Sequence, residues 1–191
     1  MSEKLKLFWP KPYWQTEAVD EWLASQEAAG WRLEGGAFFH RFVFRAAEPK
    51  ASNWFLTFSE ARGQGMYAEG SWLKRHCRAD EIDVGTFFPG AFGWADAYRV
   101  LTPIDKNSLR ELRLSRSRFL RRMAWRSLLT WLTGLALFGT LTVWGLTTRP
   151  PTLTVSSLVC YLIAALSLFW AVYHIIGLCA LRRQRRAYQD R

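Results

Sequence analysis

Cysteine and histidine are scarce in this sequence, with three of each among 191 residues. A disulfide framework needs an even, closely spaced set of cysteines, whereas Cys77, Cys160 and Cys179 are widely separated along the chain. His76 and Cys77 are adjacent, but one such pair without a second pair does not make a zinc site. We therefore expect no disulfide framework, no metal and no cofactor.

Acidic residues are almost absent from the second part of the sequence. Positions 104–191 contain three Asp or Glu and fourteen Lys or Arg, whereas positions 1–103 contain thirteen and twelve. The net charge of +10 therefore belongs entirely to the second part. The nearly neutral first part lacks the positive field that attracts a phosphate backbone, so we expect no nucleic-acid partner.

Two long runs in this basic part carry no charged residue, 127–146 and 153–181. A bilayer core of about 30 Å is spanned by about 20 helical residues, so both runs are long enough. Pro150 and Pro151 stop the first helix, because proline lacks the backbone N–H that a helix needs. We predict membrane spans over 124–146 and 153–181 with an external turn over 147–152. A pair of buried helices in a soluble protein is the alternative.

The arginines give an orientation for these spans. Seven precede the first run and five follow the second, with only Arg149 between them. The positive-inside rule then predicts a multi-pass membrane protein with both termini in the cytoplasm. We expect a basic amphipathic juxtamembrane helix over 104–123, begun by a capping box from Ser108 to Glu111, and a basic cytosolic tail over 182–191. The bilayer is the first expected partner, with these arginines as candidates for anionic headgroups: Arg116, Arg118, Arg121, Arg122, Arg182 and Arg183.

Small residues recur at helical spacing in the second span. The packing candidates are Cys160, Ala164, Ser167, Ala171 and His174. Such a stripe lets another helix approach closely, either the first span or a second copy in a homo-oligomer. An ionisable residue in a span is a functional candidate, but His174 lies near the cytoplasmic edge, where it can meet interfacial water.

The first part of the chain reads as an α+β head over 1–103. Hydrophobic periodicity and turn residues predict the following elements: strands at 4–9, 31–36, 37–45, 53–60 and 94–102, and helices at 15–29 and 70–77. Gly30 is expected to end the first helix, and Gly35-Gly36 to form a hairpin turn. One mostly antiparallel sheet covered by one or two helices is the expected architecture.

The stretch "EWLASQEAAGWRLEGG" carries a motif of Trp-Leu, a six-residue spacer and Gly-Trp-x-Leu. It resembles the bacterial domain-of-unknown-function family 2812, and the resemblance covers roughly positions 5–58. The family resemblance implies a cytosolic head followed by C-terminal spans in the bacterial inner (plasma) membrane. Members are often encoded beside PadR-type transcriptional regulators. The motif residues are Trp22, Leu23, Gly30, Trp31 and Leu33. They also have a structural explanation, because the two tryptophans would pack the helix on the sheet and Gly30 would turn the chain. We predict that Trp22, Leu23, Trp31, Phe42 and Phe44 share one core between helix and sheet.

Twenty of the thirty aromatic residues lie in the head. They indicate either a small core built from large side chains or a groove for an apolar ligand. The ligand or interface candidates are Trp9, Tyr13, Trp14, His40, Phe42, Phe88 and Trp94. Because no phosphate-binding loop or nucleophile–base constellation is present, we name no catalytic residue.

Two functions fit this organisation. The first is a non-catalytic, membrane-anchored cytoplasmic sensing or adaptor module, whose head binds an apolar ligand or a protein partner near the inner leaflet. The second is an oligomeric membrane effector, or a subunit of a transporter or channel, in which the two spans are the active part.

Overall fold

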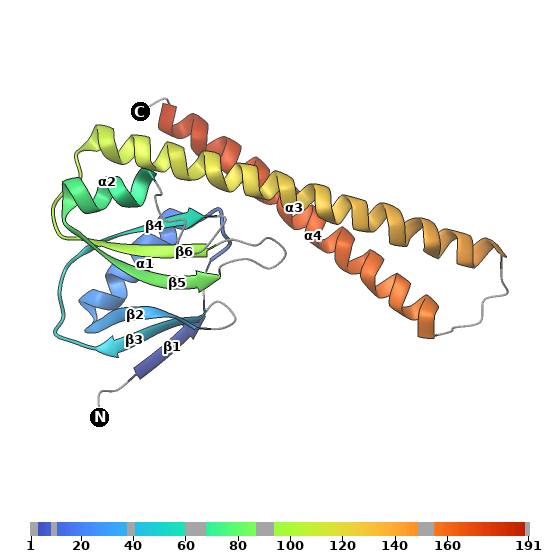
Figure 1. Ribbon diagram of the computed structural model, residues 1–191, viewed down its shortest axis with the longest axis horizontal. Helices are drawn as coiled ribbons and strands as arrows, with labels where there is room; N and C mark the ends of the chain where they lie inside the picture. Colours follow the sequence, from blue (N-terminus) through green and yellow to red (C-terminus); the bar gives the residue numbers. More distant parts are fainter. Residues whose placement is uncertain are drawn as a thin grey trace.

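The computed structural model of the chain describes residues 4–8, 11–37, 41–59, 68–86, 94–148 and 155–189. In these residues an α+β head is followed by two long helices (Figure 1). The elements are β1 (Lys4–Phe8), α1 (Thr16–Ala28), β2 (Trp31–Ala37), β3 (Arg41–Ala46), β4 (Asn53–Ser59), α2 (Ala68–Cys77), β5 (Ala79–Thr86), β6 (Trp94–Val100), α3 (Lys106–Thr148) and α4 (Val155–Gln189).

The head repeats one arrangement, strand–helix–strand–strand, twice. The first repeat forms an antiparallel sheet of order β1-β3-β2 and the second a sheet of order β4-β6-β5, which is the same order. The prediction of one sheet was therefore wrong, and it also missed β5. That strand has exposed acids at Asp80, Glu81 and Asp83, which conceal the alternation of Ile82 and Val84.

The layers of the head follow from which residues pack together. Trp54 and Leu56 belong to the core that includes α1, whereas Phe55 packs with Leu73 of α2. Because alternate residues of a strand point to opposite faces, α1 and α2 cover opposite faces of the second sheet. Helix α1 also contacts β2, so it packs against both sheets.

The predicted core of Trp22, Leu23, Trp31, Phe42 and Phe44 is confirmed. Leu23 and both phenylalanines are buried, and the two tryptophans pack against them half-buried. The ring of Trp22 lies edge-on to Phe42 and Phe44, with centroid distances of 5.3 and 5.6 Å. The predicted end of α1 is also confirmed, since Gly30 has a φ of 88°, a conformation that glycine adopts without a steric penalty.

The predicted turn at Gly35-Gly36 was wrong, because both glycines lie inside β2. A Cβ atom at Gly36 would stand 1.6 Å from the carbonyl oxygen of Val84 in β5, and one at Gly35 would stand 3.2 Å from that of Asp83. Each strand has a register shift at this point, between Leu33 and Gly35 and between Asp83 and Gly85. The glycines are needed where the edges of the two sheets meet.

We expect Gly36→Ala to destabilise the protein by about 1–3 kcal/mol, because the new methyl group would displace the backbone of β5. Chemical unfolding of the detergent-solubilised chain, followed by tryptophan fluorescence, measures this effect. Ser25→Ala, at an exposed position of α1, is the control and should change stability by no more than about 0.5 kcal/mol. Equal midpoints for the two variants would contradict the close approach of the sheets.

Helix α3 begins earlier than the capping box implies. Asp105 is the cap, since its Oδ1 accepts hydrogen bonds from the backbone N–H groups of Asn107 and Ser108 at 3.1 and 3.0 Å. Hydrogen bonds from the side chain and backbone of Ser108 lower the pKa of Asp105. Ser108 therefore donates to the cap and does not form it.

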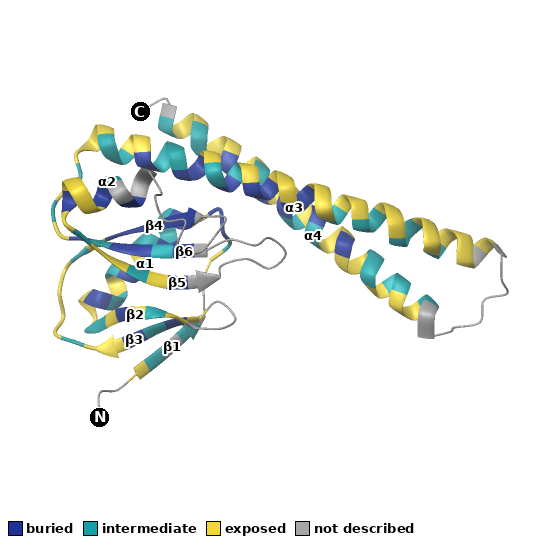
Figure 2. Cartoon of the chain, viewed as in Figure 1, coloured by how far each residue is buried: buried dark blue, intermediate teal, exposed yellow. Residues whose placement is uncertain are grey.

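Helices α3 and α4 are both long and apolar enough to cross a membrane. The candidate spans are Lys106–Gly145 and Ser157–Tyr188, with mean hydropathies of 1.4 and 2.1 in their most apolar 18 residues. Only 6% and 22% of these 18-residue segments are buried inside the structure. Among the described residues, every exposed large hydrophobic side chain except Leu101 belongs to one of these two helices. The head contacts only one end of the pair, and the rest projects away from it with a largely exposed surface (Figures 1 and 2).

Candidate functional site

A buried ion pair joins the head to α3. The Arg116 guanidinium lies 2.8 Å from Asp20 Oδ2, and the two side chains are 3% and 13% exposed. Arg116 also donates to the carbonyl oxygen of Leu56 at 3.2 Å and stacks over the ring of Phe55 at 4.3 Å. The backbone N–H of Leu56 donates to Asp20 at 3.0 Å. Arg116 was predicted to face lipid headgroups, but the structure buries it in this junction.

Burial dominates the electrostatics of Asp20. It raises the pKa of the carboxyl group to about 6, although Arg116 and the Leu56 N–H act in the opposite direction. A charged carboxylate is costly away from water unless it is paired. The Asp20 carboxylate therefore depends on Arg116, and any change that separates the two side chains leaves a buried charge.

A second ion pair reinforces this contact closer to the surface. Arg113 Nε lies 2.8 Å from Glu17 Oε1, with both side chains about one-third exposed, 34% and 35%.

The end of α4 contacts the same glutamate through Tyr188. Burial raises the pKa of the Tyr188 phenol, and the Glu17 carboxylate adds to this effect. The end of α4 therefore also reaches α1.

These ion pairs border a cavity of about 280 Å³ between α1, β4 and the start of α3, which we call the head cavity. Its apolar wall includes Trp54, Phe55, Ile104 and Leu109, and its acidic wall consists of Glu17, Asp20 and Glu21. Aromatic rings next to carboxylates suit an apolar ligand that carries a positive charge.

An aromatic contact joins the head to α4. Tyr13 and Trp14, in the loop before α1, are buried at 4% and 8% exposure. The Tyr13 hydroxyl lies 3.4 Å from Nδ1 of His174, and the ring of Trp14 lies 4.9 Å from that of Tyr173. Burial raises the pKa of the Tyr13 phenol, with the Tyr173 phenol as a second cause.

Gly177 makes this contact possible. A Cβ atom there would lie 2.3 Å from the Tyr13 hydroxyl and 2.7 Å from the Trp14 ring. About two turns further along α4, the helix is bonded to the head again, because Gln184 Nε2 donates to the carbonyl oxygen of Trp14 at 2.9 Å. Gly177 and Gln184 were not predicted as functional from the sequence. Their role depends on contacts with Tyr13 and Trp14, which are more than 160 residues away along the chain.

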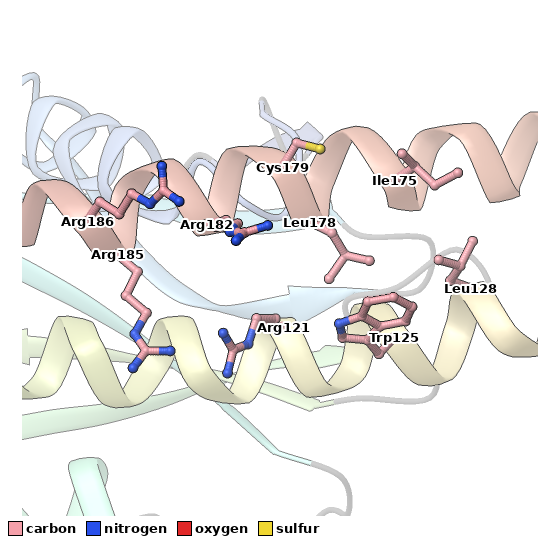
Figure 3. A pocket seen from close by; sticks show the side chains of 9 residues that line it. All are labelled: Arg121, Trp125, Leu128, Ile175, Leu178, Cys179, Arg182, Arg185 and Arg186. Atoms are coloured by element: carbon pink, nitrogen blue, oxygen red, sulfur yellow. The ribbon is translucent and has the colours of Figure 1, made fainter.

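Arginines also line a groove between α3 and α4, about 560 Å³ in volume (Figure 3). Arg121 and Arg182 were predicted headgroup residues and lie in this groove, together with Arg185 and Arg186, which were not predicted. Arg118, Arg122 and Arg183 are exposed and do not line it. Trp125 and Leu178 are among its apolar lining residues.

The predicted packing stripe on α4 lies partly against α3. Ser167, Ala171 and His174 are buried, and a Cβ atom at Gly134 of α3 would lie 3.2 Å from the Ser167 hydroxyl. Cys160 and Ala164 are half-buried. The stripe therefore serves contacts within one chain, and its use between copies stays a prediction.

The predicted ligand residues are separated by the structure. Trp9, His40 and Phe88 lie outside the described residues, and Trp94 belongs to β6. Tyr13, Trp14 and Phe42 are part of the buried core and line neither of the cavities above. The residues that do line the head cavity were missed, because acids and aromatics from three distant segments meet there only after folding.

Glu27 is a second buried carboxylate that the sequence did not reveal. It is 1% exposed and accepts a hydrogen bond from Trp54 Nε1 at 3.0 Å and one from the Ser52 hydroxyl. Arg99 donates to it at 3.2 Å. These bonds fasten the end of α1 to β4 and β6, so Glu27 has a structural role.

Among the described residues, no group of three or more His, Cys, Asp or Glu side chains is arranged to hold a metal ion. No protein-family model matches the chain, and no match was found among curated proteins or solved structures. The relationship to family 2812 therefore stays a prediction.

Proposed function

We propose that the chain is a membrane-anchored cytoplasmic module, in which α3 and α4 form a transmembrane hairpin and the head is a non-catalytic sensor or adaptor. Trp125 and Trp144 support this placement, because both are more than half exposed, at 52% and 62%. They stand about 29 Å apart along α3, close to the thickness of the bilayer core. Tryptophan is enriched at the two membrane interfaces.

The arginine distribution supports a cytoplasmic position for the head. The arginines of α3 up to Arg126 and those of α4 from Arg182 onward lie on the head side of the apolar segments. Arginine-rich flanks stay on the cytoplasmic side during insertion. The head, the start of α3 and the end of α4 are then together at the inner leaflet of a bacterial plasma membrane.

The head cavity carries the sensing proposal. It is bordered by both carboxylates that pair with α3, Glu17 and Asp20, and by Arg113. A cationic ligand bound there would compete with the arginines for the same carboxylates. Binding would then alter the ion pairs that hold the head on α3, and a partner at the membrane surface could detect the change.

The alternative, an oligomeric effector or transporter subunit, requires a polar face that lines a lumen. The exposed threonines of α3 do not provide such a face. Thr130, Thr133 and Thr140 each donate to a carbonyl oxygen one turn back in the same helix. This arrangement suits an apolar surrounding, in which polar groups must be satisfied locally. A ring of fixed stoichiometry in native mass spectrometry would favour the alternative.

Binding of benzyltrimethylammonium, a small apolar cation, tests the sensing proposal on the full-length protein in detergent. We expect saturable binding by isothermal titration calorimetry, and none for benzoate, which has the opposite charge. Glu21 lines the cavity and is exposed, so Glu21→Gln should weaken binding about two- to fivefold, the value of one partly screened ion pair.

Glu48→Gln is the matched control, because it removes the same charge at an exposed site away from the cavity. It should leave the affinity unchanged. Equal binding of the cation and benzoate, or an equal effect of the two substitutions, would contradict a cation site in the head.

A further inference from the structure

The groove between α3 and α4 has a charged end and an apolar end (Figure 3). Arg121 of α3 and Arg182, Arg185 and Arg186 of α4 line the charged end. Trp125 of α3 and Ile175 of α4 lie towards the apolar end. On α4, Arg185 and Arg186 lie three and four residues after Arg182, so the three arginines share one face of the helix. The groove is amphiphilic along its length.

The four guanidinium groups have no acidic partner in the described part of the chain. The ion pairs found there use other arginines, such as Arg113 and Arg116. Four positive charges in one groove repel each other, and an anion between them would relieve this repulsion. Guanidinium groups bind phosphate through paired, charge-assisted hydrogen bonds.

The apolar end identifies the source of the phosphate. Trp125 is 52% exposed and Ile175 is 47% exposed, so a soluble phosphate compound would leave their surfaces in contact with water. An acyl chain would cover them. The groove volume of about 560 Å³ lies within the usual range for sites that hold one small molecule.

We propose that this groove binds one molecule of a phospholipid whose headgroup carries two phosphate groups. The phosphates lie among Arg121, Arg182, Arg185 and Arg186, and an acyl chain runs past Trp125 and Ile175. Two phosphates match four guanidinium groups better than one does, and basic pockets between spans at the cytoplasmic surface suit such headgroups. The inference rests on the membrane placement of the hairpin proposed above.

The lipid would also stabilise the junction with the head. Arg185 directly follows Gln184, which donates to Trp14 of the head. A phosphate held by Arg121 and Arg185 connects α3 with α4 at this level. Loss of the lipid would loosen the end of α4 to which the head is attached.

The test uses the purified full-length protein in nanodiscs of phosphatidylcholine doped with cardiolipin, a lipid with two phosphates, or with phosphatidylglycerol, which has one. Native mass spectrometry of protein released from these discs counts the retained lipids. The groove variant is Arg182→Gln/Arg185→Gln/Arg186→Gln. The matched control is Arg118→Gln/Arg122→Gln/Arg183→Gln, which removes the same charge from exposed arginines outside the groove.

We expect one retained cardiolipin per chain, preferred over phosphatidylglycerol. The groove variant should lose at least about tenfold in affinity and the control no more than about threefold, since each arginine near an anionic lipid contributes to binding. Inorganic pyrophosphate at millimolar concentration should not displace the lipid. Circular dichroism and melting of both variants verify that each is folded.

Three results would overturn the proposal. An equal loss in both variants would show nonspecific attraction to an anionic surface. Displacement by pyrophosphate would identify a soluble phosphate ligand. Alkaline carbonate extraction separates the lipid site from the membrane anchor. If the protein stays in the membrane under carbonate but retains no lipid, the lipid site alone is refuted. If carbonate releases the protein, the membrane anchor of the proposed function is refuted.

Discussion

Replacement of Gly177 by leucine will release the head from α4. The new side chain would occupy the space of Tyr13 and Trp14, whose atoms stand 2.3 and 2.7 Å from the position of a Cβ atom. Both rings are buried among Tyr173, His174 and the helix backbone, so they cannot give way locally. Overpacking of this kind costs about 1–3 kcal/mol or more. Hydrogen–deuterium exchange of residues 11–16 should rise to the rate of an unprotected loop.

Gly139→Leu on α3 is the matched control. A Cβ atom at Gly139 meets nothing within 4 Å, so leucine should be accepted there without effect on exchange in the head. Unchanged protection of residues 11–16 in Gly177→Leu would mean that the head does not rest on α4 at this glycine.

Removal of the Arg116 side-chain charge will destabilise the protein strongly. Arg116→Met leaves the Asp20 carboxylate buried without its cation, and loss of one partner of a buried pair costs about 3–5 kcal/mol. Methionine keeps the length of the side chain and part of its contact with Phe55, so the effect reports the charge. Chemical unfolding of the detergent-solubilised protein measures it.

The double variant Arg116→Met/Asp20→Asn separates the charge effect from lost packing. It should recover more than half of the lost stability, because no charge remains buried. Arg118→Met, at an exposed position on the same helix, should change stability by about 0.5 kcal/mol or less. No recovery in the double variant would show that Arg116 acts through packing and not through Asp20.

The sequence predicted the elements that depend on local pattern. The two apolar helices, the end of α1 at Gly30 and the core around Trp22 and Phe42 followed from hydrophobic spacing and one glycine. The sequence patterns that indicate these features each extend over a few residues. They could be read without knowledge of the tertiary structure.

Features that depend on distant segments could not be predicted. Gly35 and Gly36 look like a turn until β5 is placed beside them, and Arg116 looks like one more arginine of a basic run until α3 lies on α1. The head cavity likewise needs α1, β4 and α3 together. A charged or small residue acquires its role from the partner that folding brings to it.

The proposed function requires a head that lies on the cytoplasmic side of a membrane hairpin. Single cysteines test this most directly, after Cys77, Cys160 and Cys179 are replaced by alanine, with one introduced at Thr147 near the end of α3 and another at Ser25 in the head, both exposed positions. In bacterial spheroplasts, a membrane-impermeant maleimide should label Thr147→Cys at once, and Ser25→Cys only after the membrane is opened. Labelling of Ser25→Cys in intact spheroplasts, with Thr147→Cys protected, would contradict a cytoplasmic head.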